Sequence, residues 1–212
     1  SAESVELCDD KMLTYIALAG GGVNLPDTLP APLCYYADAK VRREYVKEIG
    51  AALGYPLIAK KSFGSWGMDV ELIQNEKELA EVAEKFRMSP HLYQKYVAAH
   101  RGEDYRVLVV GGRAIAVMKR TNRHDFRSNI ECGGTGSRAE VPADFIAQAE
   151  RCAEILGLDY CGVDILDDGG RPVVCEVNSN AFFNEAEKVT GVNVAGAFAG
   201  HIASVLKCAE AE

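Results

Sequence analysis

Two carboxylates and an amide stand at a spacing that could bind a cation: Asp164, Glu176 and Asn178. The surrounding runs GVDIL and PVVCEVN are rich in β-branched residues, and DDGG between them supplies turn residues, so the stretch predicts a β-hairpin. If Asp168 faces Pro172 across a three-residue loop, Asp164 stands opposite Glu176. Cross-strand partners have Cβ atoms ~5 Å apart, and Asn178 shares their face because strand side chains alternate.

The opposite face of this hairpin is apolar and is expected to join the core; it carries Val163, Ile165, Cys175 and Val177. Two carboxylates so close together repel each other unless a proton or a cation lies between them. Magnesium is bound by one or two carboxylates together with water and phosphate oxygens, so the three polar residues are predicted metal ligands. A solvated outer face of an ordinary hairpin is the alternative. A calcium loop fits poorly because Leu166 and Cys175 occupy positions that need oxygen donors.

Composition narrows the class of protein. A chain of 212 residues can form one large domain or two small ones. The net charge of −8 argues against nucleic acid as a partner. No apolar run approaches membrane-spanning length and no secretory signal is visible, so no membrane partner is expected. The seven cysteines lack C-x-x-C spacing, which predicts reduced thiols in a cytoplasmic protein rather than zinc ligands or disulfides.

Helices and strands alternate along the chain, and Ser1 and Ala2 are left out of the fold as a cloning remnant. Asp9-Asp10 predicts the start of a helix over KMLTYIALA, and Asn75 with Glu78 forms a capping box. The further predicted segments are an extended connection over 24–33, helices over 38–53, 75–86, 142–156 and 192–208, and strands over 57–61, 68–73 and 91–97.

A glycine-rich loop joins the strands 57–61 and 68–73. Gly64, Ser65 and Gly67 lie at a hairpin tip whose backbone N–H groups can close over phosphates, with Lys60 at the end of the first strand as a point charge. No helix follows the glycines, which separates the loop from a Walker P-loop. For this segment alone, a glycine hairpin with a surface lysine is an equal alternative.

A second hairpin is expected around Gly111-Gly112. In a two-residue turn, Arg106 faces Val117 and Asp104 faces Lys119, which gives one face a charged end and an apolar body.

The polar connection after this hairpin gathers several arginines. If 126–130 is a strand, Arg127 and Asn129 point to the same side. Arginine donors match carboxylate and phosphate oxygens, so this concentration in an acidic protein suggests an anionic ligand, with a solvated loop as the commoner explanation.

Together these stretches resemble the ATP-grasp superfamily, and within it the RimK-like carboxylate–amine (alpha-L-glutamate) ligases. The resemblance spans about residues 7–207 and rests on DFRSNI with the following GG, on GVDIL paired with EVN, and on VTG at 189–191. It implies an α+β fold in which two α/β subdomains with antiparallel sheets enclose a nucleotide. The implied division is an N-terminal helix and linker at 1–22 that follows a missing domain, a small flap subdomain at 23–97 and a large, metal-binding subdomain at 98–212.

The resemblance also implies roles for individual residues. Lys11 and Lys60 resemble the lysines that reach the nucleotide phosphates, and the segment from Gly64 through Ser65 to Gly67 resembles the flap above them. Arg127 and Asn129 resemble the residues at the γ-phosphate and the nascent acyl phosphate, so Lys60 and Arg127 are the expected catalytic residues.

The remaining implied contacts surround the nucleoside and the metal. Gln94, Lys95, Tyr96 and Val97 match the hinge segment whose backbone pairs with adenine, and Asp104 matches the acid on the ribose side. Asp164, Glu176 and Asn178 look like the ligands of Mg²⁺, for which Mn²⁺ is an alternative.

The implied reaction is ATP-driven activation of a small-molecule or peptide carboxylate to an acyl phosphate, followed by attack of an amine to form an amide. Glutamate is the leading amine of the family, but SNAFFN follows EVN here where the RimK pattern continues S-P-G-like, so the substrates stay open. A small-molecule kinase, a non-catalytic ATP-binding fragment and a homo-oligomer also stay open.

Overall fold

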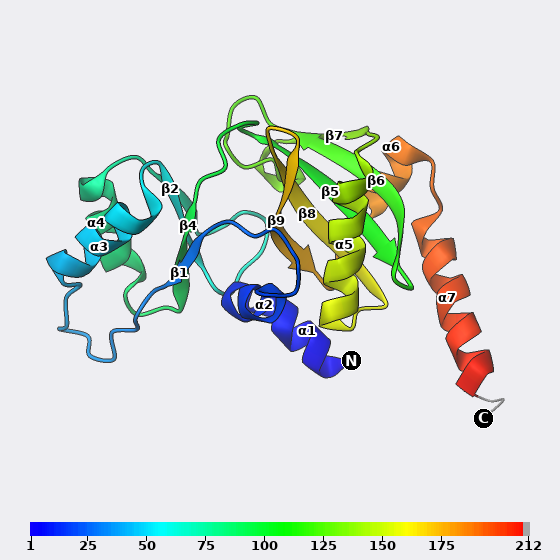
Figure 1. Ribbon diagram of the computed structural model, residues 1–212, viewed down its shortest axis with the longest axis horizontal. Coiled ribbons are helices and arrows are strands. Elements are labelled where there is room, and N and C mark those ends of the chain that lie inside the picture. Colours follow the sequence, from blue (N-terminus) through cyan, green and yellow to red (C-terminus); the bar gives the residue numbers. More distant parts are fainter. Residues whose placement is uncertain (210–212) are drawn as a thin grey trace.

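Two antiparallel sheets lie side by side in the computed structural model, which describes residues 1–209 (Figure 1). The smaller sheet has the strand order β1 (Thr28–Pro30), β4 (His91–Lys95), β2 (Leu57–Lys61), β3 (Val70–Ile73). The larger sheet has the order β7 (Thr135–Arg138), β6 (Arg113–Thr121), β5 (Glu103–Val110), β8 (Tyr160–Asp168), β9 (Arg171–Asn178). This arrangement confirms the α+β fold class.

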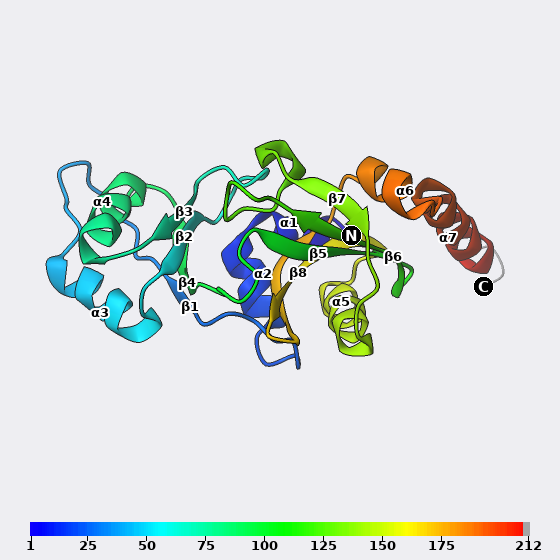
Figure 2. The same cartoon turned by 90° about the horizontal axis from the view of Figure 1, so that it is seen from above.

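The helices divide between the two sheets. Those that pack on the smaller sheet are α3 (Arg43–Leu53) and α4 (Glu76–Phe86). Those beside the larger sheet are α1 (Ala2–Asp9), α2 (Lys11–Leu18), α5 (Ala143–Leu156), α6 (Asn184–Thr190), α7 (Val194–Ala209) and the short 3₁₀ helix η1 (Ile130–Cys132). Seen from above, α6 and α7 lie at the end of the molecule farthest from the smaller sheet (Figure 2).

Two connections link the sheets, one between α2 and β1 and one between β4 and β5. They are hydrogen-bonded where they leave the smaller sheet, because the Lys95 amide donates to the Asp27 carbonyl over 2.9 Å. The first connection is also held to the larger sheet, since the Val174 amide donates to the Asn24 carbonyl over 2.8 Å.

Alternation along β2 explains how the smaller sheet serves both a core and a cavity. Leu57 and Ala59 are fully buried against α3 and α4, whereas Ile58 and Lys60 point to the other face. Strand side chains alternate between faces, so the two apolar positions fix where the lysine must point.

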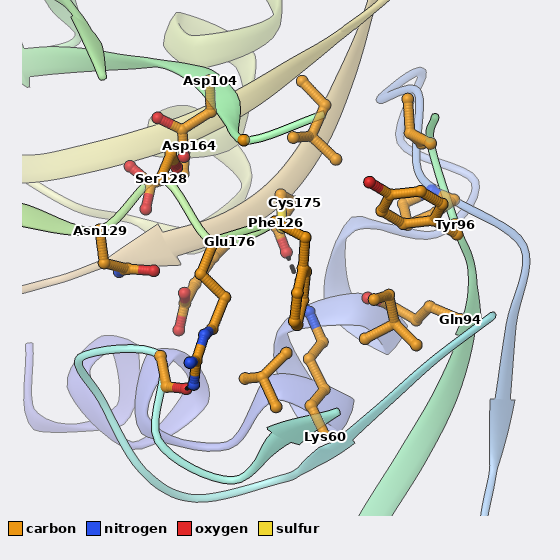
Figure 3. A pocket seen from close by; sticks show the side chains of 18 of the residues that line it. Lys60, Gln94, Tyr96, Asp104, Phe126, Ser128, Asn129, Asp164, Cys175 and Glu176 are labelled. Carbon is orange, nitrogen blue, oxygen red and sulfur yellow. Dashed lines mark hydrogen bonds between the residues drawn. The ribbon is translucent and has the colours of Figure 1, made fainter. Parts of the chain in front are cut away.

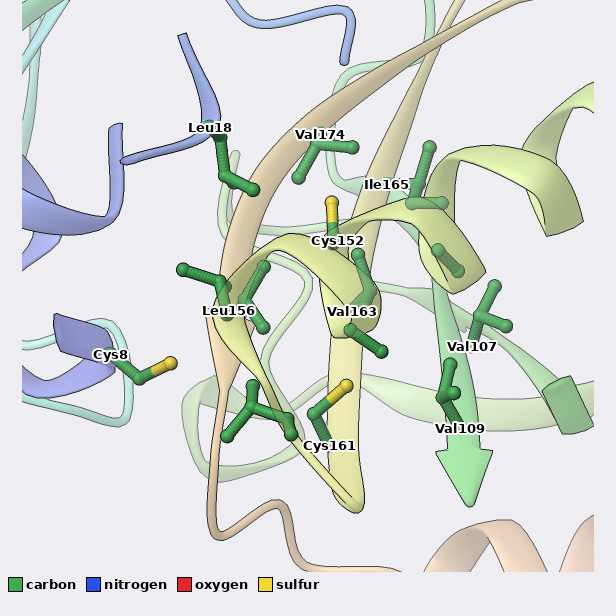
Figure 4. Close-up of a cluster of buried hydrophobic side chains, with 14 of the residues drawn as sticks. Cys8, Leu18, Val107, Val109, Cys152, Leu156, Cys161, Val163, Ile165 and Val174 are labelled. Atoms are coloured by element: carbon green, nitrogen blue, oxygen red, sulfur yellow. The ribbon is translucent and has the colours of Figure 1, made fainter. Parts of the chain in front are cut away.

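The core of the larger sheet lies under α5 and α2 (Figure 4). The predicted core positions Val163, Ile165 and Val177 are confirmed, but Cys175 is not among them and Val174 takes its place. The reason is a bulge: the register shifts between Asp164 and Ile165 of β8, which turns the thiol toward the cavity.

The same bulge explains why the β8–β9 hairpin pairs Asp164 with Glu176 although its turn differs from the predicted one. The turn has two residues, with Asp168 opposite Arg171, and not the predicted three-residue loop with Asp168 opposite Pro172. The extra residue in β9 restores the offset, so Asp164 does stand opposite Glu176 as predicted.

The β5–β6 hairpin shows a one-residue error in the predicted register. Arg106 faces Met118 and Asp104 faces Arg120, because a bulge between Leu108 and Val109 shifts the pairing beyond the turn. The shift places Arg120 on the face that had been assigned to Lys119.

Cap residues set several helix ends as predicted. Asp10 accepts from the amides of Met12 and Leu13 and starts α2, and the side chain of Asn75 accepts from the amide of Glu78 in α4. The predicted helix over 38–53 is shorter and begins at Arg43.

Three other expectations change. The helix α1, capped by the Ser1 hydroxyl, was not expected, so Ser1 and Ala2 do belong to the fold. The extended connection over 24–33 contains β1, and the predicted strand over 126–130 is irregular up to η1.

Within residues 1–209 no individual helix is long and apolar enough to span a membrane. Helices α6 and α7 reach that length and composition only as a pair, which is bent by 111°.

Candidate active site

A cavity opens between the two sheets (Figure 3). Its volume, including the open mouth, is about 960 Å³, which suits a ligand of cofactor size. All the predicted site residues except Asn178 line it: Lys11, Lys60, Gly64, Ser65, Gly67, Gln94, Lys95, Tyr96, Val97, Asp104, Arg127, Asn129, Asp164 and Glu176. The fold therefore brings together residues that lie up to 165 positions apart in the chain, from Lys11 to Glu176.

Lys60 reaches into the middle of this cavity from β2. The residue is 5% exposed, has no carboxylate partner among the described residues, and makes one long hydrogen bond of 3.4 Å from Nζ to the Cys175 carbonyl oxygen. A buried ammonium without a counter-charge is costly, and it is the kind of group that an anionic ligand would satisfy.

The acidic face opposite is crossed by two guanidinium groups. Arg106 donates to both carboxylate oxygens of Asp164, over 2.7 Å to Oδ1 and 2.8 Å to Oδ2. Arg120 bridges Asp104 and Asp164: its Nε donates to Asp104 Oδ1 over 2.7 Å, and one NH₂ nitrogen lies 2.9 Å from Asp164 Oδ2. Four buried or largely buried charges thus form one neutral network across β5, β6 and β8.

This network controls the charge state of Asp164. Burial alone would raise the pKa of its carboxyl, but Arg106 and then Arg120 attract the carboxylate and donate hydrogen bonds to it, which holds the pKa at about 2. Asp164 is 3% exposed, so it is an anion that depends on its two arginines.

Glu176 and Asn178 occupy the outer part of the same strand face. Glu176 Oε1 lies 3.2 Å from Lys11 Nζ. The Asn178 amide nitrogen lies 3.4 Å from Asp164 Oδ2, and the residue borders a second groove beside the main cavity. Asp164, Glu176 and Asn178 therefore do share one face, as the alternation predicted.

The flap over the cavity is held by two side chains, one from the start of α2 and one from the connection after β6. Lys11 Nζ donates to the Gly64 carbonyl over 2.5 Å, and Arg127 donates to the Gly67 carbonyl over 2.9 Å. A Cβ atom at Gly67 would lie 3.0 Å from Asn129 Oδ1, and its φ of +70° also favours glycine. Arg127 is oriented by hydrogen bonds to both carboxylate oxygens of Asp125, and these hydrogen bonds are the main reason why the pKa of Asp125 is lowered.

The end of β4 and the residues that follow it form the other end of the cavity. Gln94 points toward β1, where its amide donates to the Thr28 hydroxyl over 2.9 Å. Tyr96 has a buried hydroxyl that makes no hydrogen bond of good geometry within residues 1–209, although nearby Arg101 counteracts part of the pKa rise caused by burial. The walls between Lys60 and this end are apolar: Ile58, Met68, Val70, Val97, Phe126 and Leu166. A flat aromatic group would fit such a slot.

The oxygen donors of the site could hold a magnesium ion only together with phosphate oxygens of a bound ligand. Asp164, Glu176 and Asn178 supply oxygen ligands of the right type. However, Asp164 is already neutralised by two arginines and Glu176 contacts Lys11, and among the described residues no three His, Cys, Asp or Glu side chains gather closely enough to hold a metal. Phosphate oxygens would have to supply both the missing ligands and the missing negative charge.

Arg106 and Arg120 are the main site residues that the sequence did not assign. The predicted register put Arg106 opposite a valine and left Arg120 outside the hairpin face. The available signal was their alternation with Asp104 and Met118 on paired strands, which a bulge-free register obscured.

Comparison with known proteins shows which family the chain belongs to. A family model described as the RimK-like ATP-grasp domain matches residues 8–202. A probable alpha-L-glutamate ligase of Maridesulfovibrio salexigens is 36% identical over 196 residues, which is 91% of this chain and 62% of the relative. Human beta-citrylglutamate synthase B is 35% identical over 202 residues, covering 94% of this chain and 51% of the relative. The chain thus spans about half to three fifths of these relatives.

A solved structure shares the fold. The ATP-grasp ligase PsnB, in complex with a phosphomimetic variant of its minimal precursor, Mg and ADP, superposes with a TM-score of 0.71 at 21% identity, over 95% of this chain and 60% of PsnB.

Proposed function

Because this chain belongs to the RimK-like ATP-grasp family, we propose that it is the ATP-binding part of a carboxylate–amine ligase, which forms an amide through an acyl phosphate. The relatives named above, a glutamate ligase and a citrylglutamate synthase, support a ligase that joins a small-molecule or peptide carboxylate to an amino-acid amine. The observation that carries the proposal is Lys60, a buried ammonium that has no carboxylate partner within residues 1–209 and points into the shared cavity.

The cavity offers a matching place for each part of ATP. The apolar slot beside Val97 and Phe126 suits adenine, while the flap glycines, Lys60 and Arg127 suit the phosphates. Tyr96 adds an unsatisfied hydroxyl at the adenine end that a nucleobase or a water could pair.

Phosphoryl transfer asks a protein mainly for positioning and for neutralisation of charge. Lys60 and Arg127, which line the same cavity, would contact the transferring phosphate, and Lys11 would fix the flap above it. Glu176 and Asn178, together with Asp164, would hold Mg²⁺, which would supply positive charge to neutralise the phosphates. No side-chain nucleophile is needed for this chemistry.

The thiols and the fold support a reducing compartment. All seven cysteines are free, and Cys8, Cys152 and Cys161 are buried in the core. Disulfides are rare in the cytoplasm, so a cytoplasmic protein is part of the proposal.

The test is ADP release with Mg-ATP, a panel of carboxylates and a panel of amines, with mass spectrometry of the products. An amide product together with ADP and phosphate supports the ligase. A stable phosphorylated product without an amide would favour a kinase, and nucleotide binding without turnover in the full-length protein would overturn the proposal.

Glu176→Gln is the informative variant, because it removes a proposed metal ligand that is not part of the buried arginine network. It should abolish magnesium-dependent ADP release. Asp168→Asn, at the exposed tip of the same hairpin, is the matched control and should leave turnover unchanged.

A further inference from the structure

A second groove adjoins the nucleotide cavity and is a candidate for the acid side of the proposed reaction. It measures about 1230 Å³ with its open mouth and shares Lys11, Gly64, Ser65, Asn129 and Glu176 with the first cavity. Because these residues line both spaces, a carboxylate that enters the groove would meet the end of the phosphate chain. Such a carboxylate needs a cation that faces the groove.

Arg106 lines this groove, whereas the second arginine that contacts Asp164, Arg120, lines the nucleotide cavity instead. The side chain of Arg106 is 13% exposed and that of Arg120 is 2% exposed. Arg106 lies on β5 directly opposite Asp164 of β8, so its guanidinium stands between the buried network and the groove. Of the two arginines, Arg106 is the one that a ligand in the groove could reach.

The two arginines also differ in their other partners. Arg120 is shared between Asp164 and Asp104, so it keeps a carboxylate partner if Asp164 is engaged elsewhere. Within residues 1–209 the ion pair of Arg106 is with Asp164 alone, through hydrogen bonds of 2.7 and 2.8 Å. A guanidinium that depends on one carboxylate can bind another anion when that carboxylate is taken.

Binding of Mg-nucleotide would change this charge balance. Asp164 and Glu176 are proposed ligands of Mg²⁺, and a guanidinium and a doubly charged ion on the same carboxylate repel each other. Glu176 would exchange Lys11 for the metal, and Lys11 also contacts the flap, where the phosphates would balance its charge. Arg106 would then be the cation that has lost its carboxylate and still lines the groove.

From these contacts we infer that Arg106 changes its partner when Mg-nucleotide binds. It holds Asp164 in the metal-free protein, and it donates the same two hydrogen bonds to the carboxylate of the acid substrate once Asp164 is bound to Mg²⁺. This inference rests on the proposed ligase function and adds the residue that binds its acid. It also fixes an order of binding, with Mg-nucleotide first and the carboxylate second.

The remaining charges of the groove suit the other substrate. Asp9 and Glu131 also line it, and neither has an ion-pair partner in the described part of the chain. They would attract the ammonium group of the amine. The acid and the amine would thus be received by groups of opposite charge in one groove.

The change of partner can be measured on the full chain by nitrogen-15 NMR of its arginine side chains. In the metal-free protein the Nε–H group of Arg106 donates a hydrogen bond of 2.7 Å to a carboxylate, so its proton should exchange slowly with water. Saturation with Mg-ADP should shift this signal and speed up the exchange, whereas ADP without magnesium should have little effect. Arg113, whose side chain is 83% exposed, gives the reference signal and should not change.

Acetate tests the second half of the inference, because it carries a carboxylate and little else. It replaces chloride at constant ionic strength, and acetamide is the neutral control of the same shape. With Mg-ADP bound, acetate should shift the Arg106 signal and slow its exchange again, whereas acetamide should not. Without Mg-ADP the affinity for acetate should be at least about tenfold lower, since Asp164 already occupies the guanidinium.

Arg106→Gln separates this role from a structural one. If Arg106 only held Asp164 in place, its removal would raise the Mg²⁺ concentration needed for half-saturation at a fixed ADP concentration. If Arg106 competes with the metal for Asp164, this concentration should fall several-fold. Arg113→Gln, at the exposed start of β6, is the matched control and should leave it unchanged.

Four results would overturn the inference: an Arg106 signal that Mg-ADP leaves unchanged, no response to acetate, a response that acetamide or the metal-free protein also shows, or an equal or higher Mg²⁺ requirement in Arg106→Gln. The NMR measurements decide even if the variant does not fold, and no readout needs turnover. Failure of the proposed function would instead appear as absence of Mg-ADP binding in calorimetry, which is measured first on the same samples.

Discussion

Replacement of Lys60 by methionine should move stability and nucleotide affinity in opposite directions. Methionine keeps the length and the apolar stem of the side chain but removes the ammonium of a residue that is 5% exposed and has no carboxylate partner in the described part of the chain. An unsatisfied buried polar group costs about 1–3 kcal/mol, so Lys60→Met should raise the free energy of unfolding by roughly that amount. A hydrogen bond to a charged group contributes about 1.5–3 kcal/mol, so the dissociation constant for ADP should rise about 10- to 150-fold.

The neighbouring residue provides a matched control. Lys61 points to the other face of β2, where its Nζ lies 3.0 Å from Asp69 Oδ2 in a partly exposed ion pair. Lys61→Met should cost less than about 1 kcal/mol and should leave ADP affinity unchanged. Urea unfolding gives the stability of both variants, and calorimetry with Mg-ADP gives the affinity.

One pattern of results would refute the reasoning. If Lys60→Met is less stable than the parent and binds ADP equally well, the ammonium has a structural role in bridging β2 to β9 through the Cys175 carbonyl. The cavity would then lose the observation on which its assignment rests.

Four further outcomes follow from the structure. Asp164→Asn should lose about 3–5 kcal/mol of unfolding free energy, because two buried guanidinium groups would keep their charge without its partner; a near-parental urea midpoint would contradict the network. The pKa of Asp164 in the folded protein, about 2, is below its ordinary value of 3.8, so its contribution to the free energy of unfolding is present above pH 3.8 and is lost as the pH falls toward 2. The stability of Asp164→Asn should therefore lack this part of the pH dependence. The argument fails if stability falls with pH in parallel in the parent and in the variant. Gly134→Ala should destabilise the protein by about 1–3 kcal/mol and weaken nucleotide binding, because its Cβ would lie 2.1 Å from the Ser128 carbonyl oxygen. Gly200→Ala, whose Cβ would have nothing within 4 Å, should instead stabilise α7 by up to about 1 kcal/mol. Thermal unfolding compares the two variants, and equal melting temperatures would count against the packing argument. Tyr96→Phe should be as stable as the parent or more so, because the lost hydroxyl makes no good hydrogen bond, and a loss above about 1 kcal/mol in urea unfolding would show that the hydroxyl is satisfied after all.

Local signals predicted most of the secondary structure. The side chains of Asp10 and Asn75 accept hydrogen bonds from backbone amides in the first helical turn, so their positions mark the starts of α2 and α4. Helix α3 starts later than predicted, at Arg43, and no cap side chain marks its start. The irregular course of 126–129 follows from hydrogen bonds of Asn122 and Asp125 to nearby amides, which compete with strand pairing.

The pairing of Asp164 with Glu176 was predicted for a reason that proved partly wrong. The actual turn is tighter, and a bulge beside Cys175 compensates for it. Alternation on a strand is a local property, but a bulge depends on how the strand packs against its neighbours, so sequence cannot locate it reliably.

The charge balance of the site could not be foreseen for the same reason. The hairpin sequence holds no cation on its acidic face, and Arg106 and Arg120 arrive from two other strands. Which side chain lies opposite Asp164 depends on the order β6-β5-β8, a feature of topology and not of any one motif. The site residues and their roles stay predictions, whereas their convergence on one cavity is a property of the fold.

The two hydrogen-bonded connections between the sheets limit how the protein can open. Two chain connections that are hydrogen-bonded side by side favour a hinge motion, in which the smaller sheet rotates about one axis rather than sliding or twisting against the larger sheet. Gln94 and Tyr96 lie near this axis and would move little, whereas the hydrogen bonds from Lys11 and Arg127 to the flap would break. Entry and exit of a ligand would then require breaking only these two hydrogen bonds, and the adenine end of the cavity would keep its structure throughout.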